Sequence, residues 1–363
     1  MKTYLVGGAV RDLLLGIVPK DKDYVVVGST PEEMILRGFK QVGADFPVFL
    51  HPETGEEYAL ARVERKVAAG YQGFETDHSP EVTLEEDLRR RDLTINAMAW
   101  DEEEGKLYDF FGGQADLKNH VLRHTSDAFR EDPVRILRIA RFAARYNFTI
   151  HIDTLLMMEE MVNNGEFDSL VPERVWAEFD KGLREKHFWQ IWCVLDSCGA
   201  LKKLPIYERA CYSSFEAAAD ESQPLIIRCA AMFKDTTEEE FHENRIPSDI
   251  FDLALTATKC VKFFKSMSHQ TTRKDILNFY MSVDLFRRTE RFWTALTVVK
   301  YRDEMIPEII MDWANKVLSV NAGEIALACK DKKLIKERIE EARIEAMKLT
   351  DNWKDLYPHV MKG

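Results

Sequence analysis

The uneven distribution of glycine divides this sequence of 363 residues into two parts that cannot fold alike. Thirteen of the 17 glycines lie at or before Gly165, and short runs rich in aromatic and β-branched residues lie among them at 4–6 and 24–27. Such runs beside glycines predict β-strands. From about Ser126 onward, apolar residues recur instead at helical spacing. The sequence therefore predicts an α+β fold, with a small sheet domain at residues 1–125 followed by helices to the end.

Composition and charge restrict the class of protein further. With 45% hydrophobic and 31% charged residues, the chain has the composition of a soluble globular protein, and it is too long for one ordinary core. No apolar run approaches the ~20 residues that a membrane span needs, and the N-terminus lacks the apolar core of a signal peptide. We therefore expect a cytoplasmic protein with no membrane partner. The net charge of −12 argues against a protein coated in nucleic acid, although a local basic groove is compatible with it.

Cysteine occurs only in the second half of the chain. None of the six cysteines forms a C-x-x-C pair, and no Cys/His spacing matches a zinc site. We expect reduced thiols buried in a helical core.

Two glycines and two aspartates near the N-terminus form the first candidate site. Gly7-Gly8 follows the first expected strand, so its backbone N–H groups can approach a phosphate closely, and Arg11 can add a charged fork. Asp21 and Asp23 are two residues apart on an extended segment and therefore point to the same side. Such a pair can hold Mg²⁺, which prefers oxygen ligands and shares its shell with substrate phosphates. The spacing excludes a calcium EF-hand, a dinucleotide-binding fingerprint and a P-loop, so a pair of surface aspartates in a turn is the alternative.

A stripe of arginines forms the second candidate site. Its members share one face of an expected helix, while aliphatic residues cover another face; they are Arg135, Arg138, Arg141 and Arg145. Four like charges on one face repel each other unless an anion or a carboxylate partners them. The stripe is either a groove for a triphosphate and an RNA backbone, or a solvated face or a set of interdomain salt bridges.

Asp132 lies before Pro133 at the expected start of this helix, where an aspartate caps free N–H groups. A carboxylate also accepts from the exocyclic amine of cytosine or adenine, while Arg135 can donate to ring or carbonyl acceptors. Uracil and guanine would place a keto oxygen against the carboxylate. One Asp/Arg pair could thus admit CTP and ATP and reject UTP and GTP. A role for Asp132 as a simple helix cap is the alternative.

These residues belong to longer motifs that follow one another in a fixed order. The motifs are LVGGAVRD (5–12), KDKDYVVVGSTPEEM (20–34), FPVFLHPETGEEYALAR (46–62), RRDLTINAMA (90–99), DFFGG (109–113), REDPVRILRIARFAARY (130–146) and VPERVW (171–176). From Lys2 to about Leu201 the chain resembles the class II tRNA nucleotidyltransferases, the CCA-adding enzymes of the polymerase-β-like nucleotidyltransferase superfamily, in their gammaproteobacterial form. The resemblance implies a nucleotidyltransferase head domain at 1–125, a helical neck at 126–205 that selects the nucleotide, and a helical body and tail at 206–363.

The resemblance also implies roles for individual residues. The metal ligands would be Asp21 and Asp23, with Glu57 as a third acidic catalytic residue on a neighbouring strand. The nucleotide contacts would be Gly8, Arg11, Arg91, Asp92, Asp132, Arg135, Arg138 and Arg141. Among these, Gly8 and Arg11 would contact phosphates, Arg91 and Asp92 the sugar and phosphates, and Asp132 and Arg135 the base. The loop at about 66–86 would help to switch from C to A addition, and residues 109–113 would form a hinge-like segment.

The function implied is template-independent addition of C, C and A to the 3′ end of tRNA, with CTP and ATP as substrates, Mg²⁺ as cofactor and pyrophosphate as product. The alternatives are a bacterial poly(A) polymerase, an enzyme that adds only CC or only A, and a catalytically silent RNA-binding protein. None of the nine histidines is followed by aspartate, so we expect no HD phosphohydrolase domain. The stretch at 210–363 carries no motif of its own, and its part in binding tRNA is inferred from its position.

Overall fold

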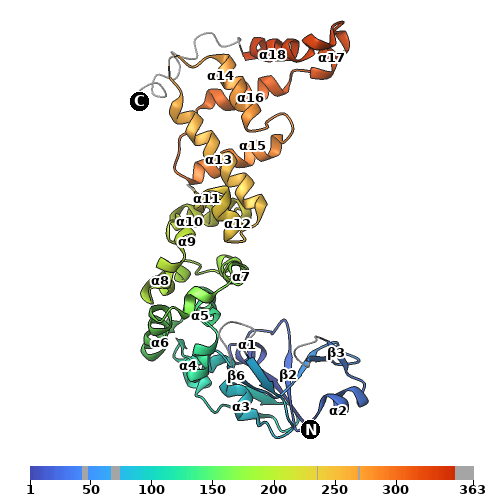
Figure 1. Ribbon diagram of the computed structural model, residues 1–363, viewed down its shortest axis with the longest axis vertical. Helices are drawn as coiled ribbons and strands as arrows, with labels where there is room; N and C mark the ends of the chain where they lie inside the picture. Colours follow the sequence, from blue (N-terminus) through green and yellow to red (C-terminus); the bar gives the residue numbers. More distant parts are fainter. Residues whose placement is uncertain (43–47, 67–73, 235, 269, 348–363) are drawn as a thin grey trace. The chain divides into compact units, whose positions relative to one another are not determined.

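The computed structural model describes residues 1–42, 48–66, 74–234, 236–268 and 270–347 (Figure 1). The loop expected at 66–86 therefore lies partly outside the described residues. The chain forms two compact units, residues 1–208 and 209–363. The first unit holds both the sheet and the helices that follow it, and all motifs of the sequence analysis lie within it. The α+β class is confirmed.

A seven-stranded sheet forms the base of the first unit, in the order β3-β4-β5-β2-β1-β8-β9. The strands are β1 (Lys2–Val6), β2 (Asp23–Val27), β3 (Lys40–Val42), β4 (Val48–Leu50), β5 (Glu57–Leu60), β8 (Ala99–Asp101) and β9 (Lys106–Tyr108). The two strands expected at 4–6 and 24–27 are β1 and β2, which pair antiparallel, with Val6 opposite Asp23. β5 pairs with β2 in parallel, with Glu57 opposite Asp23. The sheet thus places the start of β2 next to the glycine turn that follows β1.

Both faces of the sheet are covered by apolar side chains. Strand residues alternate between faces, so Val25 and Val26 enter different clusters. Val25 packs with Leu84 and Leu88 of α3 (Leu84–Arg89), whereas Val26 packs with Met34 of α2 (Pro31–Leu36). Asp23 shares the face of Val25 by this alternation, which is the face that α3 covers.

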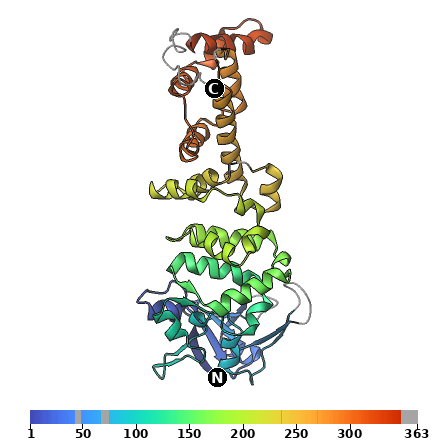
Figure 2. The ribbon, with the colours of Figure 1, turned by 90° about the vertical axis from the view of Figure 1, so that its left-hand side faces the viewer.

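The helical part of the first unit is built around α5 (Val134–Tyr146). Its buried stripe, which includes Ile136, Leu137 and Ala140, packs against α7 (Pro172–Leu183) and α8 (Gln190–Ser197), as both ribbon views show (Figures 1 and 2). The other helical segments of this unit are α1 (Gly8–Leu14), η1 (Thr94–Asn96), α4 (Gly113–Lys118), η2 (Asp127–Glu131), α6 (Ile152–Asn163), η3 (Glu166–Ser169), η4 (Ala200–Lys203) and α9 (Pro205–Glu208). Two small ribbons complete it, β6 (Val63–Lys66) with β7 (Phe74–Asp77) and β10 (Val121–Leu122) with β11 (Thr149–Ile150).

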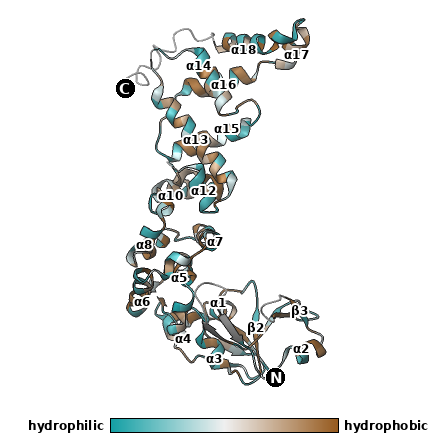
Figure 3. Ribbon diagram, in the orientation of Figure 1, coloured by the Kyte–Doolittle hydropathy of each residue, from teal (hydrophilic) through white to brown (hydrophobic). Residues whose placement is uncertain are grey.

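The second unit is helical throughout its described residues. Its elements are α10 (Tyr212–Asp220), α11 (Leu225–Met232), α12 (Glu238–Glu243), α13 (Ser248–Ser266), α14 (Arg273–Ser282), α15 (Thr289–Tyr301), α16 (Glu308–Leu318), α17 (Ala322–Ala328), η5 (Lys332–Leu334) and α18 (Ile335–Ala346). Hydrophobic and hydrophilic residues alternate along these helices (Figure 3). The buried Arg302 donates to the carbonyls of Ala230 and Phe233 at the end of α11, which satisfies groups that the helix leaves open.

Two general expectations are partly tested by this architecture. All six cysteines are free, but only Cys198, Cys229 and Cys260 are buried, and Cys193 is exposed because it lies on the outer side of the short helix α8. The expectation that all of them are buried was therefore wrong. No helix in the described part of the chain is long and apolar enough to cross a membrane.

The segment 109–113, expected as a hinge, is tied to its surroundings. The Asp109 carboxylate accepts from the backbone N–H groups of Gly113 (2.8 Å) and Gln114 (2.9 Å), which caps α4. Gly113 packs directly on η1: a Cβ added there would lie 2.3 Å from the carbonyl oxygen of Thr94. Glycine is thus required at 113 for α4 to support the segment that carries Arg91 and Asp92.

Gly113→Ala is expected to lower the free energy of unfolding by about 2–3 kcal/mol, because backbone rather than a flexible side chain must move to admit the methyl group. Gly323→Ala is the matched control, since Gly323 is an exposed helix residue whose added Cβ would lie 3.3 Å from the Asn321 side chain. Urea denaturation of both variants measures the difference. Equal stability of the two variants would contradict the close packing at Gly113.

Candidate active site

A pocket of about 1570 Å³ lies between the sheet and the helices of the first unit. Nine arginines and one lysine line it, against five carboxylates. The pocket is thus strongly cationic in a chain whose net charge is −12. It is also larger than the 300–1,000 Å³ of a common small-molecule site, which leaves room for a second ligand beside a nucleotide. All predicted site residues except Glu57 line this pocket.

The glycine turn forms one corner of the pocket. Gly7 has φ +69°, a left-handed conformation that favours glycine, and Gly8 begins α1. A Cβ on Gly7 would lie 2.9 Å from Nη1 of Arg91, so the missing side chain makes room for that guanidinium. The turn and Arg91 therefore face the same space, next to the start of β2.

Asp21 and Asp23 are exposed at this corner. Burial raises the pKa of Asp23, the positive charge of Arg91 lowers it and the negative charge of Asp21 raises it, with a net shift upward. The negative charge of ionised Asp23 is thus energetically unfavourable in its surroundings, and a bound cation would stabilise it. Two carboxylates without nearby thiol or imidazole ligands fit a hard divalent cation that completes its shell with substrate oxygens.

Glu57 lies on the strand next to Asp23 but outside the pocket lining. It is opposite Asp23 in the β2–β5 register and on the same face. Within the described ranges, no group of three or more His, Cys, Asp and Glu residues could hold a metal ion. The role of Glu57 as a third acidic residue stays a prediction.

Asp87 on α3 holds two of the arginines and has no role in the sequence analysis. Its fully buried carboxylate pairs with Arg90 (2.7 Å) and Arg91 (3.2 Å) and accepts from the backbone N–H of Arg62 (3.3 Å). Burial alone would raise the pKa of Asp87, but Arg90 and Arg91 overcome that effect and lower it. Asp87 thus fixes Arg91 next to the glycine turn. The local sequence TLEEDLRR indicates only that Asp87 belongs to a helix with a capping box and does not identify its two arginine partners.

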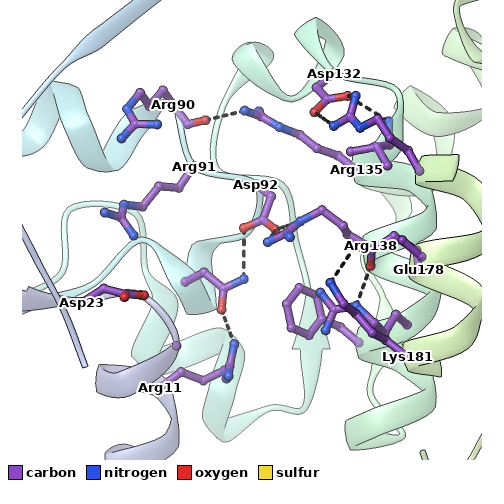
Figure 4. A pocket seen from close by; sticks show the side chains of 18 of the residues that line it. Arg11, Asp23, Arg90, Arg91, Asp92, Asp132, Arg135, Arg138, Glu178 and Lys181 are labelled. Atoms are coloured by element: carbon purple, nitrogen blue, oxygen red, sulfur yellow. Dashed lines mark hydrogen bonds and ion pairs between the residues drawn. The ribbon is translucent and has the colours of Figure 1, made fainter. Parts of the chain in front are cut away.

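The buried Asp92 forms a second pair with the partly exposed Arg138 (Figure 4). Nε and Nη2 of Arg138 lie 2.8 and 2.7 Å from Oδ2 of Asp92. Burial would raise the pKa of Asp92, but the charge of Arg138 and hydrogen bonds from Asn96 and Arg138 lower it. The pair connects η1 and its neighbours to α5, so the sheet side and the helical side of the pocket are joined through it.

The remaining arginines of the stripe are also partnered. Arg135 donates to the carbonyl oxygens of Ala128 (2.7 Å) and Arg90 (2.8 Å). Arg141 pairs with the buried Glu178 (2.5 Å), and Arg145 contacts Asp12 (3.4 Å). Asp12 and Asp92 belong to the predicted 1–125 segment, whereas the arginines that contact them belong to 126–205. These contacts are therefore salt bridges between the two predicted segments, which was one interpretation of the stripe. Because all four arginines also line the pocket, the two interpretations of the stripe are compatible.

Asp132 has the capping role, and base selection by this residue stays a prediction. Its Oδ1 accepts from the backbone N–H of Val134 (3.1 Å), which caps the start of α5. Its two oxygens also pair with Arg174 of α7, at 3.0 and 2.7 Å. Arg174 belongs to the VPERVW motif, but nothing in the local sequence connects it with a residue 42 positions earlier.

The Arg11 side chain is more deeply buried than we expect for a residue that only contacts phosphate. Its side chain is 5% exposed, pairs with Asp12 (2.7 Å) and lies over the rings of Phe142 and Tyr146, with centroid distances of 5.4 and 5.1 Å. It still lines the pocket beside Gly8. Direct contact between Arg11 and a phosphate therefore stays a prediction.

Two sequence families match the first unit. Residues 3–123 match the poly A polymerase head domain, and residues 147–211 match a family described as the probable RNA and SrmB-binding site of polymerase A. Curated relatives match more of the chain. The CCA-adding enzyme of Coxiella burnetii (strain RSA 493) is 49% identical over 300 residues, which cover 80% of this chain and 79% of that protein. The multifunctional CCA protein of Chromobacterium violaceum is 43% identical over 410 residues, which cover 98% of this chain and 100% of that protein.

Solved structures with the same fold include the Thermotoga maritima CCA-adding enzyme complexed with tRNA, with a TM-score of 0.67 and 22% identity over 99% of this chain and 91% of that one. A CCA-adding enzyme in complex with CTP has a TM-score of 0.67 and 24% identity, over 95% of this chain and 87% of that one. These likenesses cover both units of the chain and support the fold.

Asp87→Asn is expected to lower the free energy of unfolding by about 3 kcal/mol near pH 7, because Arg90 and Arg91 lose a buried partner. The folded pKa of Asp87 lies below the ordinary 3.8, so its stabilising contribution is present above that pH and is lost as pH falls through the folded value. The stability difference should therefore narrow below pH 3.8, as urea denaturation over a pH series would show. Asp180→Asn, which removes an exposed pair with Arg184, is the control with an effect below about 1 kcal/mol. A pH-independent difference would refute the ionic role of Asp87.

Proposed function

This chain belongs to the CCA-adding enzymes, and we propose that the cationic pocket of its first unit is where nucleotides are added, with Asp21 and Asp23 holding Mg²⁺. The chain adds C, C and A to the 3′ end of tRNA from CTP and ATP. The observation that carries the residue assignment is the juxtaposition of the two exposed carboxylates, the glycine turn and Arg91 at one corner of a pocket lined by arginines. No other group of side chains in the described residues combines these features.

Nucleotidyltransferases of this family generally use a divalent metal. Asp21 and Asp23 supply the hard oxygen ligands that Mg²⁺ prefers. When bound there, Mg²⁺ would neutralise charge on the triphosphate and increase the nucleophilicity of the RNA 3′-hydroxyl. Arg91, fixed by Asp87, and the backbone N–H of Gly8 would bind the triphosphate and stabilise the negative charge that develops on the leaving pyrophosphate. Arg138 and Arg141 add positive charge on the opposite wall of the pocket.

Base selection is assigned to Asp132 and Arg135 at the start of α5. Asp132 accepts from the exocyclic amine of cytosine or adenine, and Arg135 donates to their ring or carbonyl acceptors. Arg135 is held in place by two backbone carbonyls, so its guanidinium is fixed before a base arrives. A keto oxygen of uracil or guanine would face the Asp132 carboxylate, which places one acceptor against another.

The division of labour along the chain is part of the same proposal. We assign nucleotidyl transfer to a head domain at 1–125, nucleotide selection to a neck at 126–205, and tRNA binding to the helices of 206–363. A cytoplasmic location belongs to the proposal, because tRNA and nucleotides are found there.

One assay tests the activity as a whole. Purified protein is given tRNA truncated by three nucleotides, with labelled CTP, labelled ATP or both. A CCA-adding enzyme incorporates two C residues with CTP alone and one further A when ATP is added. Incorporation of many A residues with ATP alone would indicate a poly(A) polymerase, and a stop after CC or a requirement for CC-ended tRNA would indicate a partial enzyme. No incorporation with intact protein would indicate a silent RNA-binding protein.

Asp23→Asn is expected to reduce CTP incorporation by a factor on the order of 10³, since one of the two metal ligands is lost. The same change should not lower thermal stability, because the raised pKa of Asp23 shows that its negative charge is unfavourable in the folded protein. Asp127→Asn, which neutralises an exposed aspartate outside the pocket, is the control. Normal incorporation by Asp23→Asn would refute the metal assignment.

Asp132→Ala is expected to lower the ratio of kcat/KM for CTP to that for UTP by roughly tenfold or more, the usual value of one hydrogen-bonded base contact. Steady-state kinetics with single nucleotides and truncated tRNA measure this ratio. Asp127→Ala, again outside the pocket, should leave it unchanged. If Asp132→Ala slows CTP and UTP addition equally, the residue is a helix cap only.

A further inference from the structure

The side-chain amide of Asn96 lies between a buried arginine and a buried carboxylate of the pocket. Its Oδ1 accepts from Nη1 of Arg11 at 2.6 Å, and its Nδ2 donates to Oδ1 of Asp92 at 3.0 Å. Asn96 ends η1 and is 6% exposed. With the Asp92–Arg138 pair, it completes a continuous chain of hydrogen bonds from Arg11 of α1 to Arg138 of α5, and its two ends can be followed in Figure 4.

An amide satisfies both neighbours of this position. Arg11 has donors and no acceptor, and an ionised Asp92 has acceptors and no donor. A side chain between them must therefore accept on one side and donate on the other. The neighbours also fix which end of the Asn96 amide is oxygen and which is nitrogen, because the reverse orientation would place donor against donor and acceptor against acceptor.

Asp92 has no acceptor left for a ligand. Its Oδ1 accepts from the backbone N–H of Leu93 (2.9 Å) and from Asn96, and its Oδ2 accepts twice from Arg138 (2.8 and 2.7 Å). These four bonds use the acceptor capacity of a carboxylate. In this arrangement Asp92 acts on the pocket through the residues that it holds.

Arg11 is positioned in the same way. Its Nε and Nη2 donate to Oδ1 of Asp12 at 2.9 and 2.7 Å, which fixes one edge of the guanidinium. Asn96 fixes the other edge, through Nη1. Between these two supports, Nη2 lies 3.3 Å from the place where a Cβ of Gly8 would be, so the guanidinium directly underlies the glycine turn.

We propose that Asn96 is a positioning residue that couples the two ends of the nucleotide site. By accepting from Arg11 and donating to Asp92, it fixes the guanidinium beneath the Gly7-Gly8 turn and, through Asp92, the guanidinium of Arg138 across the pocket. The proposal rests on the proposed function, in which these groups surround the triphosphate and sugar. Since triphosphate and ribose are common to CTP and ATP, Asn96 supports both substrates equally and does not select the base.

Three substitutions separate hydrogen-bond polarity from side-chain volume. Asn96→Asp keeps the size and the acceptor for Arg11 but removes the donor and places a second carboxylate against Asp92. Asn96→Ser is smaller but keeps a donor and an acceptor. Asn119→Asp, at an exposed position after α4, is the matched control for an added negative charge. Each variant is measured for kcat/KM with CTP and with ATP, for equilibrium binding of CTP with Mg²⁺, and for thermal stability.

The expected result is a loss of kcat/KM of roughly tenfold or more for Asn96→Asp and about threefold for Asn96→Ser, with equal factors for CTP and ATP. The dissociation constant of CTP should rise in the same order, and the preference for CTP over UTP should not change. If Asn96 only filled volume, Asn96→Ser would lose more kcat/KM than Asn96→Asp. That result would overturn the proposal.

Three further outcomes are decisive. Activity of Asn96→Asp within twofold of wild type would overturn the proposal, as would unequal factors for CTP and ATP. Loss of activity with an unchanged dissociation constant for CTP and a lowered melting temperature would show a folding defect and also overturn it. If the wild-type chain itself incorporates neither nucleotide into truncated tRNA, the proposed function fails, while the CTP-binding measurements still decide the role of Asn96.

Discussion

Buried carboxylates hold the arginines of the pocket, and the rest of the site depends on that pairing. Asp87, Asp92 and Glu178 each have a side chain at most 9% exposed, and each holds an arginine that lines the pocket. Removing a carboxylate from water is costly, and the ion pair together with additional hydrogen bonds offsets that cost. The result is a set of guanidinium groups whose directions are fixed before a polyanion binds, so little side-chain entropy remains to be lost on binding.

Asp21 and Asp23 follow the opposite principle. They are exposed, and the pKa of Asp23 is raised, so the folded protein gains nothing from the negative charge of Asp23. Arg91 lies close enough to lower that pKa, yet its guanidinium is directed to Asp87. Asp87 therefore keeps Arg91 from forming a salt bridge that would compete with a metal at Asp23. In the proposed site, the same residue thus fixes the arginine that would bind phosphate and leaves the two aspartates open to the metal.

The parts of this site that could be predicted from the sequence are those set by local geometry. The strands β1 and β2, the turn at Gly7 and the start of α5 at Asp132 each follow from a few adjacent residues. Their partners could not be predicted, because Asp87, Asn96 and Arg174 reach the site through the packing of other elements, and one sequence does not show which carboxylate meets which arginine. The motif around Arg11 predicts a phosphate contact but does not show that Phe142 and Tyr146 cover this side chain. Both rings come from a helix more than 120 residues away in the sequence.

In the base-selecting role that we propose for Asp132, a structural contact and the choice of base depend on the same atoms. Its oxygens accept from Val134 and twice from Arg174, so each oxygen already has a donor. A base that presents an amine can replace an N–H of Arg174 and leave the carboxylate equally satisfied. A keto base presents an acceptor at that position, so displacing Arg174 would leave the partly buried carboxylate without its ionic partner, at a cost of about 1–3 kcal/mol. Selectivity then comes less from attraction to the correct base than from the existing Asp132–Arg174 pair, which an incorrect base cannot replace.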